Sequence, residues 1–291
     1  MKKIIYLLIL CLTTSIFYSC SKDEPDTANS IFDTSAPELN SFDQWLRDNY
    51  VIPYNIQVKY KLEDIETDYA YNVIPADLEK SKRMAFLLKY LWIEAYKEVA
   101  GDGIHFVRAN APRVMHYLGS AEYDDRGKRL GVAEGGMKIT ITEVNDLIPS
   151  QIIYQEFFNT IHHEFGHILC QTIDIPIDFR TITPADYAPS TWFNRSDEEA
   201  AELGFVSPYA SSLPEEDFVE VLARYITYTP AEWQAKLTQA GTTGSELITI
   251  KLGRVKTYMK NAWKVDLDQL KAVVQRRAYE IQFIDLDNLG F

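Results

Sequence analysis

Cysteine is scarce in this sequence of 291 residues, which holds three of them, Cys11, Cys20 and Cys170. The first two lie in or next to an apolar N-terminal stretch, so Cys170 is the single thiol in the part expected to fold. A disulfide framework is therefore excluded, and stability must come from a hydrophobic core. Roughly 250 remaining residues are enough for one compact domain or two closely packed lobes.

Basic residues are also few: 29 lysines and arginines face 42 aspartates and glutamates, and the formal net charge is −13. Loss of residues 1–19, which hold two lysines and no acids, would change this charge to −15. A chain this acidic does not attract nucleic-acid phosphates. Nucleic acid is therefore excluded as a partner.

No apolar run is long enough to form a mature membrane span. The first twenty residues, MKKIIYLLILCLTTSIFYSC, combine a charged start with an apolar run from Ile4 to about Leu12, followed by the small residue Ser19. This layout is typical of a secretory signal peptide, predicted over residues 1–19. Export of the chain follows from this prediction.

Cys20 comes directly after Ser19, and this pair resembles the lipobox of bacterial lipoproteins, in which the cysteine is acylated and becomes the first mature residue. Residues 20–40 are then a lipidated tether to the membrane, polar and unsuited to a core. The alternative is cleavage near Ser19 that leaves a free cysteine. The stretch 21–24, Ser-Lys-Asp-Glu, is similar to the signal that sends Bacteroidetes lipoproteins to the outer face of the outer membrane. The alternative is a solvated linker that carries no localisation signal.

Hydrophobic periodicity predicts an α+β fold. Residues 54–62 alternate as in a strand, 75–101 read as a helix with Asp77 as N-cap, and 104–144 read as strands, with 138–144 (KITITEV) as an edge strand. A second helix covers about 150–172. Further helices are predicted at 215–228, 231–240 and 245–277. The order places a small sheet and one helix before a helical C-terminal lobe, with a site between the lobes.

The second helix carries His163-Glu164-Phe165-Gly166-His167, a match to H-E-x-x-H. On a helix the two histidines lie one turn apart on one face, with Glu164 beside them. Two imidazoles so placed can hold zinc, and a carboxylate next to them can take a proton from a water that the metal activates. His162 faces away from the pair. It is predicted either to support another residue of the site or to pack in the core.

Zinc in a hydrolase needs a third protein ligand. The metzincin pattern would place a glycine at position 170 and a histidine at position 173, where this chain has Cys170 and Ile173. A carboxylate on a later helix, as in gluzincins, is therefore expected. One candidate cluster consists of Asp197, Glu198, Glu199 and Glu202.

The other candidate cluster lies within 215–220, at the start of a predicted helix. There Glu216 and Glu220 lie one turn apart on one face, which suits a ligand followed by a carboxylate that orients an imidazole. Either glutamate could be the ligand. Glu216 as a plain helix-start charge is a further alternative.

Residues 208–220, PYASSLPEEDFVE, resemble the catalytic domain of anthrax lethal factor, in which a tyrosine lies seven residues before the glutamate of E-x-F-x-E and HEFGH is the zinc helix. The resemblance implies that Tyr209 is the tyrosine, Glu216 the third zinc ligand and Glu220 the supporting glutamate. Exchange of roles between the two glutamates stays open. Tyr209 as a simple packing residue is an alternative to its being catalytic.

The lipoprotein start, HHEFGHIL, GFVSPYA and EDF-x-E also resemble a family of zinc metallopeptidases found as Bacteroidetes lipoproteins, from about residue 41 to the C terminus. This implies a zincin-like fold over 41–291, a gluzincin-type Zn²⁺ site and a peptide or glycoprotein substrate at the cell surface. It also implies association with glycan-uptake machinery.

These observations predict zinc-dependent peptide hydrolysis with Glu164 as general base and Tyr209 as hydrogen-bond donor to the oxyanion. The substrate is expected to lie along 138–144. The alternative is a catalytically silent glycan- or glycoprotein-binding lipoprotein on the same fold; the intact Glu164 argues against it. A second alternative is a metal with a structural role, and the absence of a fourth cysteine or histidine ligand argues against it.

Overall fold

The computed structural model describes residues 38–68, 70–124, 127–129, 131–134, 136–148 and 151–291. The chain divides into two units, Met1–Leu39 and Asn40–Phe291. The predicted signal peptide, Cys20 and nearly all of the predicted tether lie outside the described residues. None of the helices that the structure describes combines the length and apolarity needed to cross a bilayer.

The second unit begins with short helical segments, followed by a longer helical stretch from Leu78 to Val99. Asp77 caps that stretch as predicted, because its side chain accepts from the backbone N–H groups of Glu79 and Lys80 at 2.9 and 3.0 Å. The segments are α2 (Ser41–Leu46), η2 (Arg47–Val51), α3 (Ile52–Tyr54), η3 (Asp64–Glu66), α4 (Leu78–Leu88), η4 (Lys89–Ile93), α5 (Glu94–Val99) and α6 (Ile104–Asn110).

Four strands form one small mixed sheet, in the order β1-β2-β6-β5. Its strands are β1 (Gln57–Lys59), β2 (Val114–Tyr117), β5 (Gly131–Glu134) and β6 (Lys138–Ile141). β1, β2 and β6 are parallel, whereas β5 pairs with β6 in the antiparallel direction. A separate hairpin joins β3 (Glu122–Asp124) to β4 (Gly127–Arg129).

Two strand predictions are wrong. Residues 104–110 form the helix α6, in which the buried residues Phe106 and Val107 are neighbours in sequence; a half-buried strand would send them to opposite faces. The segment 138–144 is not an edge strand, because β6 pairs with β2 on one side and β5 on the other. Substrate therefore cannot add to β6, and the end of the described sheet nearest the motif helix is β5.

The helices predicted from about residue 150 onward are present, except that the expected helix 245–277 is two helices, separated at Lys264, whose φ is 57°. The stretch between α7 and α10, read as loop-rich from the sequence, also holds short helical segments. The helical segments after β6 are η5 (Val144–Asp146), α7 (Gln151–Thr172), α8 (Ile177–Arg180), η6 (Trp192–Asn194), α9 (Asp197–Glu202), η7 (Tyr209–Ser211), α10 (Pro214–Thr227), α11 (Pro230–Gln239), α12 (Gly241–Trp263), α13 (Leu267–Glu280) and η8 (Ile281–Phe283).

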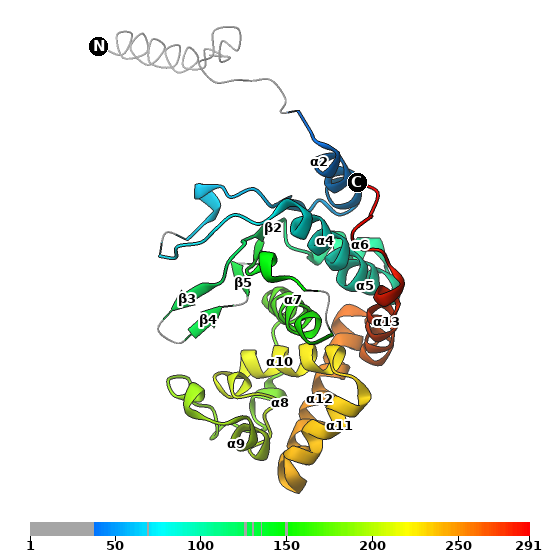
Figure 1. Ribbon diagram of the computed structural model, residues 1–291. Helices are drawn as coiled ribbons and strands as arrows, with labels where there is room; N and C mark the ends of the chain where they lie inside the picture. Colours follow the sequence, from blue (N-terminus) through cyan, green and yellow to red (C-terminus); the bar gives the residue numbers. More distant parts are fainter. Residues whose placement is uncertain (1–37, 69, 125–126, 130, 135, 149–150) are drawn as a thin grey trace, which may run out of the picture. The chain divides into compact units, whose positions relative to one another are not determined.

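Helix α7 lies between the sheet-bearing part and α10, and it contacts both β5 and α10 (Figure 1). On one side Phe165 packs edge-on against Trp92 and Tyr96, with ring centroids 5.3 and 4.9 Å apart. On the other side, a Cβ added at Gly166 would lie 3.0 Å from Val219 Cγ1 and 3.1 Å from Leu222 Cδ2 of α10. The missing side chain lets α10 approach α7, and the predicted α+β fold with an embedded motif helix is confirmed.

Candidate metal centre

The two motif histidines face each other from consecutive turns of α7. The Nε2 atoms of His163 and His167 are 3.1 Å apart, and the rings meet edge-on with centroids 4.8 Å apart. His163 is 7% exposed. Because α7 packs against β5 and against α10, the pair lies between the sheet-bearing part and α10.

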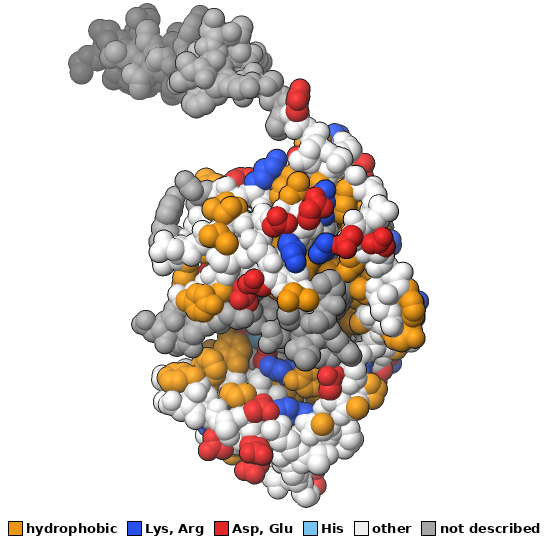
Figure 2. All heavy atoms as spheres, in the orientation of Figure 1, with side chains coloured by type: hydrophobic (Ala, Val, Ile, Leu, Met, Phe, Trp, Pro, Cys, Tyr) orange, Lys and Arg blue, Asp and Glu red, His pale blue; other side chains and the backbone are white. Residues whose placement is uncertain are grey.

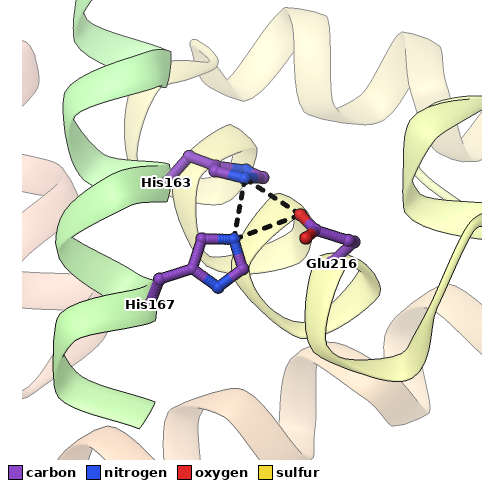
Figure 3. Close-up of side chains that lie close together, drawn as sticks. All are labelled: His163, His167 and Glu216. Atoms are coloured by element: carbon purple, nitrogen blue, oxygen red, sulfur yellow. Dashed lines mark hydrogen bonds and ion pairs between the residues drawn. The ribbon is translucent and has the colours of Figure 1, made fainter. Parts of the chain in front are cut away.

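Glu216 comes from the first turn of α10, which starts after Leu213 with Pro214 at its first position. Pro is favoured there because a first-turn N–H needs no intrahelical partner, and acids in that turn complement the helix dipole. The Glu216 Oε2 atom lies 3.2 Å from His163 Nε2 and 3.1 Å from His167 Nε2 (Figure 3). Three ligand-type atoms from two helices therefore converge on one point.

Glu220 lies one turn further along α10 and contacts His163 from the other side. Its Oε1 is 3.0 Å from His163 Nδ1, and its Oε2 accepts from Arg224 Nε at 2.8 Å and from the Ser207 hydroxyl. Glu220 is 4% exposed. Its carboxylate fixes the ring orientation of His163 and leaves Nε2 turned toward Glu216, as a carboxylate that supports a ligating imidazole does.

The electrostatic field of this cluster favours a cation. Burial works against a charged His163, but hydrogen bonds to Glu216 and Glu220 outweigh it and raise the imidazole pKa to about 10. Burial likewise works against a charged Glu216, but His163 and His167 lower its pKa to about 2. The two glutamates therefore favour positive charge on His163 despite its burial.

The distances between the converging atoms fit zinc. Tetrahedral zinc with ligand bonds of about 2.0–2.1 Å places neighbouring ligand atoms about 3.3 Å apart. The three distances among His163 Nε2, His167 Nε2 and Glu216 Oε2 are 3.1, 3.1 and 3.2 Å. Among the described residues, these three side chains are the one group of three or more His, Cys, Asp or Glu whose ligand atoms, one from each residue, lie within 4.8 Å of one another. Two nitrogens and one carboxylate oxygen are a donor set that zinc accepts.

Glu164 and Tyr209, the two predicted catalytic residues, both lie near the converging atoms. Glu164 is 9% exposed, and its charge helps to raise the pKa of His163 and that of Tyr209. The Tyr209 ring lies 5.9 Å from the His163 ring, and the residue is 37% exposed. Burial and the charge of Glu216 raise the pKa of the Tyr209 hydroxyl well above its ordinary value, so the hydroxyl keeps its proton.

The competing acidic cluster, from Asp197 to Glu202, lies in helix α9 and stabilises the start of that helix. Ser196 and Glu199 form a capping box at the start of that helix, and Asp197 pairs with Lys236 at 2.6 Å. No member of this cluster belongs to the converging group. A surface hollow of about 450 Å³ borders α9, and its lining includes Asn194 and Glu199 but none of the converging residues.

The remaining candidates lie apart from the converging atoms. His162 is buried; its Nδ1 lies 3.3 Å from the Tyr96 hydroxyl, and burial lowers its pKa to about 3. Burial raises the pKa of the partly buried Cys170 to about 12, consistent with a packing thiol. Sequence reasoning missed Ser207 and Arg224. Arg224 could have been found, because it follows Glu220 by one helical turn.

Known proteins give matches to most of the chain. Residues 35–268 match the model of the family described as "Putative zinc-binding metallo-peptidase". A crystal structure of a protein with the same description, from Bacteroides caccae ATCC 43185, is 46% identical in sequence with a TM-score of 0.77. The match covers 89% of this chain and 100% of that one. No curated protein matches.

Proposed function

Because the chain belongs to this family of zinc-binding metallopeptidases, we propose that it hydrolyses peptide bonds at a zinc ion held by His163, His167 and Glu216. The observation that supports this most directly is the triangle of 3.1–3.2 Å among their ligand atoms. When bound, zinc supplies Lewis acidity, which acidifies water and polarises a carbonyl group.

The chain's own residues supply the proton transfers. The Glu164 carboxylate follows His163 on α7, and it would take a proton from the attacking water and later give it to the leaving amine nitrogen. The protonated Tyr209 hydroxyl would donate a hydrogen bond to the oxyanion. Glu220 would keep His163 in the tautomer whose Nδ1–H points to the carboxylate and whose Nε2 is free for the metal.

The peptide would add to the sheet along β5. This strand ends the described order of the sheet, runs antiparallel to β6 and contacts α7. An extended peptide paired with its outer edge would be held by main-chain hydrogen bonds beside the converging residues.

The proposed setting is the cell surface, with the lipid on Cys20 as membrane anchor and a peptide or glycoprotein as substrate. The support is the sequence of residues 1–24. Radiolabelled palmitate that is incorporated into the wild-type chain and not into Cys20→Ser, followed by protease accessibility on intact cells, would test both parts.

The decisive experiment compares Glu164→Gln with the wild type. Purified protein is assayed for bound zinc and for cleavage of a mixture of unstructured peptides, with and without a chelator. We expect equal zinc in both proteins and cleavage by the wild type alone, reduced by at least about a hundredfold in the variant. Zinc-loaded wild type that cleaves nothing would favour the catalytically silent binding protein, and cleavage that survives in the variant would refute Glu164 as the base.

Tyr209→Phe provides a second, graded test. Loss of one oxyanion donor is expected to lower kcat by about a hundredfold while zinc content is unchanged. An unchanged kcat would mean that Tyr209 only packs against His163.

A further inference from the structure

A row of three aromatic rings leads away from the converging histidines. The Tyr209 ring is 5.9 Å from that of His163, the Trp192 ring is 5.0 Å from that of Tyr209, and the Phe193 ring is 5.8 Å from that of Trp192. The last two contacts are edge-to-face. Tyr209 belongs to η7, and the other two residues belong to η6, so two separate loops build the row.

Backbone hydrogen bonds hold the two loops together. Ala188 N donates to Ser211 O at 2.8 Å, and Trp192 N donates to Ala188 O at 2.9 Å. Arg195 closes the η6 turn, with its guanidinium bonded to Asp186 O at 2.6 Å. The rings are therefore presented by a braced loop beside the first residues of η7.

The row does not belong to the hydrophobic core. None of the three residues is in the buried core cluster or among the partly buried residues that pack against it. Phe193 is 51% exposed and Tyr209 37%. Figure 2 shows hydrophobic side chains on the side of the molecule where Figure 1 draws the loops around α8 and α9. Aromatic surface left uncovered next to a catalytic group is typical of a ligand-binding wall.

We propose that this aromatic row is a substrate subsite, which receives a large apolar or aromatic side chain of the residue flanking the scissile bond. The inference rests on the proposed peptidase function. The row contains no charged side chain, and the nearby Arg195 is directed to Asp186 and to the Phe205 ring, 5.9 Å away. Edge-to-face rings with one open face accept a further aromatic or aliphatic group, and they offer no ion-pair partner to a carboxylate.

The test uses Phe193→Ala, since Phe193 is the most exposed ring of the row and does not contact the histidines. The matched control is Phe283→Ala, because Phe283 is also an exposed aromatic residue, at 71%, and lies in η8, outside the site. Purified full-length proteins would be assayed on quenched peptides that differ only at the two residues flanking the cleaved bond, with Phe, Leu, Ala, Asp or Lys.

We expect wild type and Phe283→Ala to cleave the Phe or Leu peptide at one flanking position with a kcat/KM roughly tenfold above that of the Ala peptide. Phe193→Ala should lose most of this ratio, chiefly through a higher KM for the Phe or Leu peptide. A ratio is insensitive to loss of folded protein, so instability of the variant cannot mimic this result.

The two failures are distinguishable. If the wild type cleaves peptides in a zinc-dependent manner with no apolar preference, or if Phe193→Ala keeps the preference, the subsite is wrong and the peptidase function stands. If the wild type with bound zinc cleaves none of the peptides, the proposed function fails and the subsite fails with it.

Discussion

Replacement of Glu220 by alanine tests whether this glutamate supports the proposed metal site or is itself a metal ligand. The Glu220 carboxylate accepts hydrogen bonds from Arg224 Nε at 2.8 Å and from the Ser207 hydroxyl, and it lies 3.0 Å from His163 Nδ1. Only 4% of the residue is exposed. The variant would leave the Arg224 guanidinium without its buried carboxylate, and removing one partner of a buried ion pair costs about 3–5 kcal/mol.

The same variant should weaken zinc binding without abolishing it. His163 would lose the carboxylate that fixes its ring, and loss of such a partner typically lowers metal affinity about 10–100-fold. Glu216→Ala should show the opposite balance. The metal-free fold should lose less stability than in Glu220→Ala, because the Glu216 side chain is 17% exposed and that of Glu220 is 5% exposed, whereas zinc affinity should fall further than in Glu220→Ala.

The assay has two arms for each protein. Urea unfolding after chelator treatment gives the free energy of unfolding without metal, and competition with a chromophoric chelator gives the zinc affinity. Glu220→Gln is the matched control, because it keeps an oxygen acceptor for His163 and removes only the charge. If Glu220→Ala lost zinc while Glu216→Ala retained it, the roles of the two glutamates would be reversed. If Glu220→Ala unfolded like the wild type, the reasoning about the buried pair would be wrong.

Three further substitutions test the supports of the site. Gly166→Ala should gain about 1 kcal/mol in helix propensity and lose more through its 3.0 Å contact with Val219 Cγ1, so that the melting temperature falls. Lys251→Met should lower the free energy of unfolding by about 3–5 kcal/mol in a urea titration, because Lys251 Nζ is 2.7 Å from Asp217 Oδ2 and both side chains are fully buried; adding Asp217→Asn should restore part of the loss. Ser196→Ala removes the capping box of α9 and should cost about 1 kcal/mol, with no effect on zinc affinity. Unchanged stability in any of the three would contradict the corresponding contact.

Short-range patterns in the sequence predicted several parts of the structure. Residues 163–167 place two imidazoles on one helical face whatever the rest of the chain does, since the geometry of one turn is fixed. Asp77 as a cap and the helices after residue 214 were also readable from short-range signals. These predictions succeeded because each depends on residues within one or two turns of one another.

Strand pairing and tertiary packing determined the parts of the structure that the sequence did not predict. The apolar pattern of 138–144 suits a strand but does not say which strands lie beside it, and β2 and β5 take both sides. Residues 104–110 are too short for periodicity to distinguish a strand from a helix, and their contacts made them helical.

The two glutamates Glu216 and Glu220 show most clearly what short-range spacing predicts and what tertiary packing adds. Their spacing places Glu216 and Glu220 on one face of one helix, but it does not show which of them meets the imidazole Nε2 atoms. That follows from the packing of α10 against α7 at Gly166, in a register that sets Glu216 at 3.1–3.2 Å from both Nε2 atoms and Glu220 behind His163. The aromatic row likewise exists only because backbone hydrogen bonds bring η6 beside η7. Spacing along a chain fixes which side chains share a face, whereas long-range packing fixes what that face meets.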